Sequence, residues 1–184
     1  MLLEEKTLKT ETIYKGRKFS FCSDDVLLPN GDTSKRDYIK HPGGVTVAAL
    51  NDKNELYFVK QFRYPFMGVV TELPAGTLEI NEDPLEAGKR ELREETGIVG
   101  GEYYSLGEFY PSTGYTNEII YLYYTRVKEI KNQNLDEDEF INVVKIPLKE
   151  AYQMVLKGEL KDGKSQAAIL KLVCAFAKDK CFEL

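Results

Sequence analysis

The sequence predicts a layered α/β fold in which strands and helices follow one another along a single chain. Strand patterns precede one helix that has clear start and stop signals, further strand patterns follow it, and two amphipathic helices complete the chain. A length of 184 residues suggests one domain, or a domain with a small appendage. We therefore expect an N-terminal antiparallel β unit over residues 1–42 and a main domain over residues 43–184.

The first forty residues are predicted to form the antiparallel β unit. Residues 7–22 intersperse polar side chains with β-branched and aromatic ones, and Asn30-Gly31 supplies the positive φ angles of a tight hairpin. The main sheet should begin near Val45. There the stretches GGVTVAAL and ELYFVKQF, joined by the turn-like NDKN, predict a second hairpin with buried side chains.

A helix is predicted over residues 83–96. Asp83 is suited to the N-cap, Pro84 to the first turn, and Gly97 to the position just past the last turn. Residues 102–110 and 118–128 predict strands on either side of the turn PSTGYTN. The stretches LKEAYQMVLKGEL and SQAAILKLVCAFAK predict the two C-terminal helices.

Composition excludes several classes of function. Hydrophobic residues make up 42% of the chain, enough for a packed core, and the net charge of -5 argues against binding to nucleic acid or anionic lipid. Three cysteines without metal-ligand spacing argue against a disulfide framework or zinc site. We find no signal-peptide pattern and no membrane-spanning stretch, so we expect a cytoplasmic protein. His41 is the only histidine, and the chemistry must therefore depend mainly on carboxylates.

Three glutamates are concentrated on one side of the predicted central helix. In RELREETG, Glu91 and Glu95 are one turn apart, and Glu94 follows Glu91 by three residues. A like-charged pair at this spacing destabilises a helix by about 0.2–0.5 kcal/mol. A divalent cation would offset the repulsion, because Mg²⁺ prefers carboxylate oxygens. The alternative is a solvated surface balanced by neighbouring bases, namely Lys89, Arg90 and Arg93.

The stretch GTLEINEDPLEAGKRELREETGI, residues 76–98, resembles the Nudix box and fills each of its specified positions. These positions are Gly76, Glu82, Arg90, Glu91, Leu92, Glu94, Glu95, Gly97 and Ile98. The resemblance implies a hydrolase that cleaves nucleoside diphosphates linked to another moiety. It also implies a mixed β-sheet sandwiched between helices, with the box forming loop, helix and loop.

The resemblance further implies roles for the residues of the box. Glu91, Glu94 and Glu95, with the main-chain carbonyl of Ala75, would bind Mg²⁺, or Mn²⁺ as the alternative. Arg90 would orient these glutamates by ion pairing. Glu82 would be an outer ligand or a structural partner.

Residues outside the box resemble ADP-ribose pyrophosphatases. The run QFRYPFMGVVTELPAG matches the segment that precedes the box in a broad group of nucleotide-sugar pyrophosphatases, and Pro111 matches a proline that favours ADP-ribose within that group. By this likeness Arg63 would contact a phosphate, Glu72 would lie beside the nucleotide, and Glu118 would lie near the terminal ribose. Residues expected near adenine, in part from a second subunit, are Arg36 and Phe19 or Phe21; for both phenylalanines core packing is an equal alternative.

The general base is expected on the acidic segment DEDE at residues 136–139. Related ADP-ribose enzymes use a glutamate of a mobile loop, and here Glu137 matches the base whereas Glu139 matches a metal-contacting acid. A solvated loop is the alternative.

These resemblances predict Mg²⁺-dependent hydrolysis of ADP-ribose to AMP and ribose 5-phosphate by a homodimer joined through its N-terminal strands. A pyrophosphatase for GDP-mannose or another nucleotide sugar is the alternative enzyme. A module that binds ADP-ribose without cutting it is the alternative outside catalysis.

Overall fold

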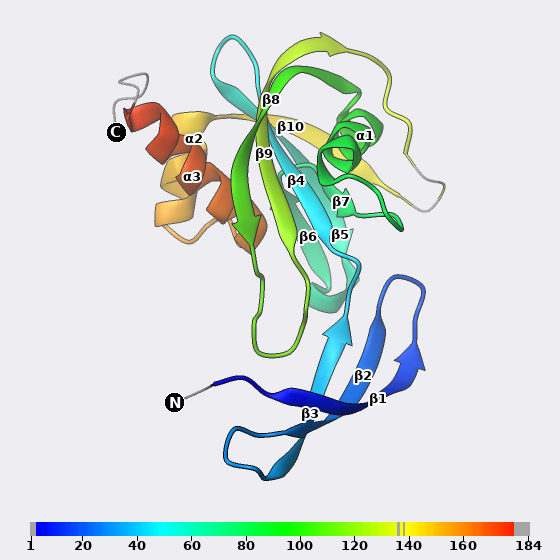
Figure 1. Ribbon diagram of the computed structural model, residues 1–184. Helices are drawn as coiled ribbons and strands as arrows, with labels where there is room; N and C mark the ends of the chain where they lie inside the picture. Colours follow the sequence, from blue (N-terminus) through cyan, green and yellow to red (C-terminus); the bar gives the residue numbers. More distant parts are fainter. Residues whose placement is uncertain (1–2, 136, 138, 179–184) are drawn as a thin grey trace. The chain divides into compact units, whose positions relative to one another are not determined.

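The computed structural model describes residues 3–135, 137 and 139–178, and its chain divides into two units (Figure 1). The first unit contains Met1–Gly43 together with Tyr110–Ile119, and the second contains Gly44–Phe109 together with Ile120–Leu184.

The first unit is a three-stranded antiparallel sheet, as the N-terminal patterns predict. Its strands β1 (Lys6–Lys15), β2 (Ser20–Leu27) and β3 (Thr33–Lys40) lie in the order β1-β2-β3. Gly31, with φ of 92°, lies in the turn between β2 and β3. The loop over residues 110–119 belongs to this unit because Ile39 donates its N–H to the carbonyl of Tyr115 and accepts a hydrogen bond from the N–H of Asn117. The sequence alone placed this loop in the main domain.

The second unit contains a seven-stranded mixed sheet. The main strand order is β10-β5-β4-β9-β8, in which β4 and β9 are parallel and the other neighbours antiparallel; β6 pairs with β5 and β7 with β4. The strands are β4 (Gly44–Leu50), β5 (Glu55–Arg63), β6 (Gly68–Glu72), β7 (Ala75–Thr77), β8 (Ile98–Phe109), β9 (Ile120–Ile130) and β10 (Ile141–Pro147). A short 3-10 helix, Tyr64–Phe66, joins β5 to β6.

Helices cover both faces of this sheet (Figure 1). Helix α1 (Pro84–Thr96) lies on one face, and α2 (Leu148–Leu156) with α3 (Gly163–Lys178) lies on the other. Strand β4 is buried along its whole length because successive side chains point to opposite faces: Ala48 and Leu50 pack with α2 and α3, whereas Val47 and Ala49 pack with Leu92 of α1. The predicted sheet between helices is therefore confirmed.

The predicted ends of helix α1 are also confirmed. The side chain of Asp83 accepts hydrogen bonds from the N–H groups of Leu85 and Glu86, and Pro84 begins the helix. Gly97 ends it with a left-handed φ of 73°.

None of the helices among the described residues is long and apolar enough to cross a membrane.

Candidate active site

The buried end of the site is formed by Glu95 and by the start of β7. Glu95 is 3% exposed, and one of its carboxylate oxygens accepts a hydrogen bond from the N–H of Ala75 at 2.9 Å. Burial raises the pKa of Glu95 to about 8, against the opposing hydrogen bond from Ala75, and the nearby carboxylates of Glu91 and Glu139 raise it further. The protein by itself therefore disfavours the ionised form of Glu95.

Gly76 leaves the space that the carboxylate of Glu91 occupies. A Cβ built on Gly76 would lie 1.9 Å from the carboxyl carbon of Glu91, so any larger residue would displace that group. Burial also raises the pKa of Glu91, although Arg90 opposes the shift. The carboxylates of α1 thus come directly against the chain segment that carries Ala75.

Arg90 is the hub of an ion-pair network along α1. Its Nε and Nη2 donate to the two carboxylate oxygens of Glu82, at 2.9 and 3.0 Å. Its Nη1 donates to Glu91 at 2.8 Å and to Glu94 at 3.1 Å. These contacts are the ones that the orienting role of Arg90 would require, and that role stays a prediction. They also make Glu82 a structural partner, because its hydrogen bonds with Arg90 lower its pKa despite some burial.

The donor set fits a divalent cation. It consists of carboxylate oxygens and a main-chain carbonyl, which hard cations such as Mg²⁺ prefer. Two of the carboxylates have raised pKa values, so that a cation would remove an electrostatic cost. Within the described residues, however, no three acidic, histidine or cysteine side chains form a ready-made cluster for an ion. Arg90 donates hydrogen bonds to Glu91 and Glu94 in this structure.

The segment that leads to the predicted base is anchored to the C-terminal end of α1. The N–H of Lys131 donates to the carbonyl of Gly97, the N–H of Asn134 to that of Glu94, and the amide of Gln133 to that of Glu95. These bonds satisfy carbonyls that a helix end leaves without partners. These hydrogen bonds were not predictable from the sequence, because no local pattern marks residues 131–134.

The two glutamates of the acidic segment differ in their surroundings. Glu139 is half-buried and close enough to raise the pKa of both Glu91 and Glu95. Glu137 is exposed. The other two acids of DEDE, Asp136 and Asp138, lie outside the described residues.

Arg63 and Glu72 form a bidentate ion pair next to the carboxylates. Arg63 donates from Nε and Nη2 to the two oxygens of Glu72 at 2.6 and 2.8 Å, and Glu72 is 2% exposed. Burial alone would raise the pKa of Glu72, but hydrogen bonds from Arg63 and Lys164 hold it below its ordinary value. Sequence reasoning missed Lys164, which is 92 residues from Glu72 along the chain.

The remaining predicted site residues belong to the first unit. Phe19 and Phe21 are 48% and 39% exposed, so neither is part of this chain's core. Arg36 makes two hydrogen bonds to Glu5 of the same chain. Glu118 lies 3.5 Å from Nδ1 of His41.

Pro111 lies in the loop of the first unit, and His41 has a role in a turn there. The Nδ1 of His41 accepts a hydrogen bond from the N–H of Gly43. The main-chain N–H of His41 donates to the side-chain oxygen of Asn117, which belongs to the same unit. His41 therefore stabilises the turn that leads to Gly43.

An acidic helix against one face of a mixed sheet, with an arginine hub and a carbonyl-bearing strand, defines a hydrolase site of the Nudix type. A family model described as NUDIX domain matches residues 40–169, and the chain belongs to this family.

The chain is similar to proteins with three different names. It is 42% identical over 170 residues to a methanol dehydrogenase activator of Bacillus methanolicus, covering 91% of this chain and 92% of the relative. It is 40% identical over 169 residues to an ADP-ribose pyrophosphatase of Bacillus subtilis (strain 168), covering 91% of each. A GDP-mannose pyrophosphatase of Enterobacter sp. (strain 638) is 31% identical over 153 residues, covering 77% of this chain and 80% of the relative.

A solved structure of an ADP compounds hydrolase matches with a TM-score of 0.84 and 17% identity, covering 99% of each chain. At this identity the likeness confirms the fold.

Proposed function

We propose that this protein hydrolyses ADP-ribose to AMP and ribose 5-phosphate, with Mg²⁺ as the cation and the cytoplasm as its place of action. The observation that carries the proposal is the pair of carboxylates formed by the half-buried Glu91, held against Gly76, and the buried Glu95, held against Ala75. The name of the relative in Bacillus subtilis supports ADP-ribose as the substrate. The three cysteines, whose number and spacing argue against a disulfide framework, fit a reducing compartment and so support the cytoplasm.

The chain's own residues have distinct tasks in this reaction. Glu91, Glu94, Glu95 and the carbonyl of Ala75 would hold the cation, which when bound draws charge from the diphosphate and makes a bound water more acidic. Arg90 keeps the glutamates oriented through its hydrogen bonds.

Two steps fall to residues outside helix α1. Arg63 binds a phosphate oxygen of the diphosphate, a group that its planar guanidinium suits. A glutamate of the acidic segment accepts the proton of the attacking water, and we assign this task to Glu137 because Glu139 lies near the cation-binding carboxylates. One P–O bond of the diphosphate breaks, and the water oxygen forms the new P–O bond.

A panel of nucleoside diphosphate compounds tests the proposal. Turnover with Mg²⁺ and with Mn²⁺ would be measured for ADP-ribose, GDP-mannose and other nucleotide sugars, with the products separated. We expect kcat/KM to be highest for ADP-ribose, and Glu95→Gln to lower kcat about 100-fold or more in a folded protein. Near-normal activity of Glu95→Gln would reject the site.

GDP-mannose is the second candidate substrate, since relatives with about a third identical residues are named for it. A higher kcat/KM for GDP-mannose would decide in its favour. Tight binding of ADP-ribose without any turnover would instead identify a sensing module.

A further inference from the structure

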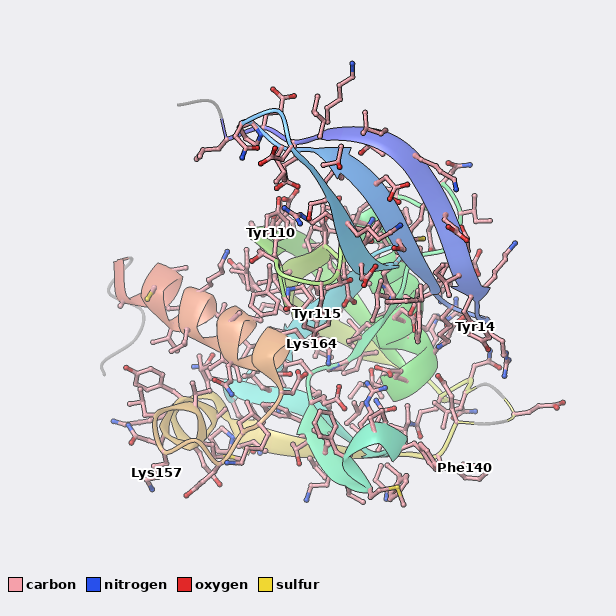
Figure 2. The ribbon with its side chains drawn as sticks, turned by 90° about the horizontal axis from the view of Figure 1, so that it is seen from below. Tyr14, Tyr110, Tyr115, Phe140, Lys157 and Lys164 are labelled. Atoms are coloured by element: carbon pink, nitrogen blue, oxygen red, sulfur yellow. The ribbon has the colours of Figure 1, made fainter. Side chains whose placement is uncertain are left out.

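We propose that Lys164 is a positioning residue that, through Glu72, holds the Arg63 guanidinium in place for the substrate diphosphate. The inference rests on the proposed function, because it takes Arg63 as the phosphate-binding group. Lys164 lies in the first turn of α3 (Figure 2), on a helix that contributes none of the residues assigned to the site above.

A closed ring of hydrogen bonds joins this turn to the segment after β6. Lys164 donates from Nζ to Glu72 and, at 2.9 Å, to Asp162. The hydroxyl of Ser165 donates to Asp162 and accepts a hydrogen bond of 2.7 Å from the N–H of Leu73. Since Leu73 follows Glu72 in the chain, the ring fixes both the backbone and the side chain at this point.

The segment held by the ring bears on both sides of the site. On the substrate side of the site, Arg63 is bound to Glu72. On the cation side, the N–H of Ala75, three residues after Glu72, donates to Glu95. Between them, the carbonyl of Pro74 accepts hydrogen bonds from Thr46 and from the N–H of Val47.

Burial makes the contact of Lys164 significant. The side chains of Glu72 and Lys164 are 3% and 13% exposed, and buried charge-assisted hydrogen bonds are strong and geometrically specific. Arg63 is 39% exposed, so it can reach a ligand while two of its nitrogens remain on Glu72.

Charge balance explains why a second cation is needed on Glu72. With both Lys164 and Arg63 on one carboxylate, part of the positive charge of Arg63 remains available to an anion. Without Lys164, the buried carboxylate of Glu72 would depend on Arg63 alone. The charges of Arg63 and Glu72 would then cancel, and the pair would have no net charge to attract a diphosphate. Because a phosphate contact of Arg63 exists both before and during the reaction, its weakening should raise KM more than it lowers kcat.

Three variants test the inference in the full-length protein. Lys164→Met removes the charge and keeps the length of the side chain, and Lys164→Arg restores the charge. Lys171→Met is the matched control, since Lys171 lies on the same helix and donates outside the ring, to the carbonyl of Leu106. For ADP-ribose we expect Lys164→Met to raise KM about tenfold with kcat within about threefold of wild type. Lys164→Arg should recover most of that loss, and Lys171→Met should behave as wild type.

A second measurement does not depend on the substrate. The Nε–H resonance of Arg63 in a ¹H–¹⁵N spectrum, assigned by its loss in Arg63→Lys, reports on the bond to Glu72. It should shift in Lys164→Met, return towards the wild-type position in Lys164→Arg, and stay unchanged in Lys171→Met.

The two measurements separate failure of the inference from failure of the proposed function. A wild-type protein that leaves ADP-ribose intact refutes the proposed function, and the resonance then decides the inference alone. An unchanged Arg63 resonance in Lys164→Met overturns the inference, as does a wild-type KM in a protein that hydrolyses ADP-ribose.

Discussion

At the scale of single residues, Gly76 shows that a motif position can be recognised in the sequence without its structural reason. Glycines stand at both ends of the box. Gly97 does require its left-handed φ of 73°, but Gly76 has no positive φ. Its missing side chain is needed because the carboxylate of Glu91 occupies the space. Sequence alone could not separate these reasons, since the contact joins residues fifteen positions apart.

Gly76→Ala should therefore abolish most activity without unfolding the protein. The added methyl group would displace the carboxylate of Glu91, and a misplaced electrostatic group costs about 100-fold or more in kcat. Gly101→Ala is the control, because a Cβ there would meet its nearest neighbour, the carbonyl of Arg126, at an ordinary 3.6 Å. Steady-state kinetics and thermal unfolding of both variants provide the check. A Gly76→Ala protein with wild-type kcat would contradict the assigned role of Glu91.

The acidic segment gives the second prediction for single residues. Glu137→Gln should lower kcat about 100-fold or more with KM nearly unchanged, as expected for loss of a general base. Glu139→Gln should in addition raise the Mg²⁺ requirement, because Glu139 lies near Glu91 and Glu95. The measurement is kcat for both variants across a Mg²⁺ titration. Wild-type turnover in both would place the base elsewhere, with Glu94 or Glu118 as the next candidates.

At the scale of elements, helix α1 was predictable at its two caps and unpredictable in its surroundings. Asp83 and Gly97 carry local signals, and both occupy the expected positions. No local sequence signal marks the hydrogen bonds of Gln133 and Asn134 to the last turn of α1. They form because the fold brings the segment after β9 to the end of this helix.

Gln133→Met should destabilise the protein by about 1 kcal/mol, the typical contribution of one hydrogen bond. The substitution leaves the carbonyl of Glu95 without the amide donor of Gln133. Gln153→Met, at an exposed position of α2, is the matched control and should be close to neutral. Urea unfolding of the two variants tests this, and equal midpoints would argue against a stabilising role for residues 131–134.

Glu72 links β6 to β5 and α3, and its charge should make stability depend on pH. Its pKa in the folded protein is below the ordinary value of 4.5, so the ionised form stabilises the fold fully above that value. This stabilisation is lost as the pH falls through the lower folded-state value. Urea unfolding from about pH 6 to pH 3 should therefore show a steeper loss of stability in wild type than in Glu72→Gln. Parallel curves for the two proteins would count against the ion pair.

At the scale of the whole molecule, the sequence predicted the family and the sheet between helices because the box is local and complete. It did not predict that residues 110–119 join the first unit, since only the contacts of Ile39 with Tyr115 and Asn117 determine this. Lys164 escaped prediction for the same reason: its partner Glu72 is brought to it by the fold. Features encoded by residues close together in the sequence, such as the box, were therefore predictable. Contacts between residues far apart in the sequence were not.

The first unit exposes several large apolar side chains on its three strands. Strand β1 is exposed at every position, and its residues Leu8, Ile13 and Tyr14 are each more than half exposed (Figure 2 labels Tyr14). Small sheets of this kind need another surface for stability, and exposed apolar strands tend to pair with other chains. A second copy of the chain would supply such a surface.

The protein is accordingly predicted to be a homodimer joined through this unit. Sedimentation should give a mass of about twice 21.0 kDa. Ile13→Asp, which places a charge on β1, should shift the protein towards the monomer and reduce ADP-ribose turnover, because residues of the first unit are expected to complete the partner's adenine site. Leu156→Asp alters an equally exposed aliphatic residue of the second unit, 58% against 54%, and should leave the mass unchanged. A wild-type monomer that is fully active at nanomolar concentration would refute the shared site, because a site completed by a second chain loses activity when dilution separates the chains.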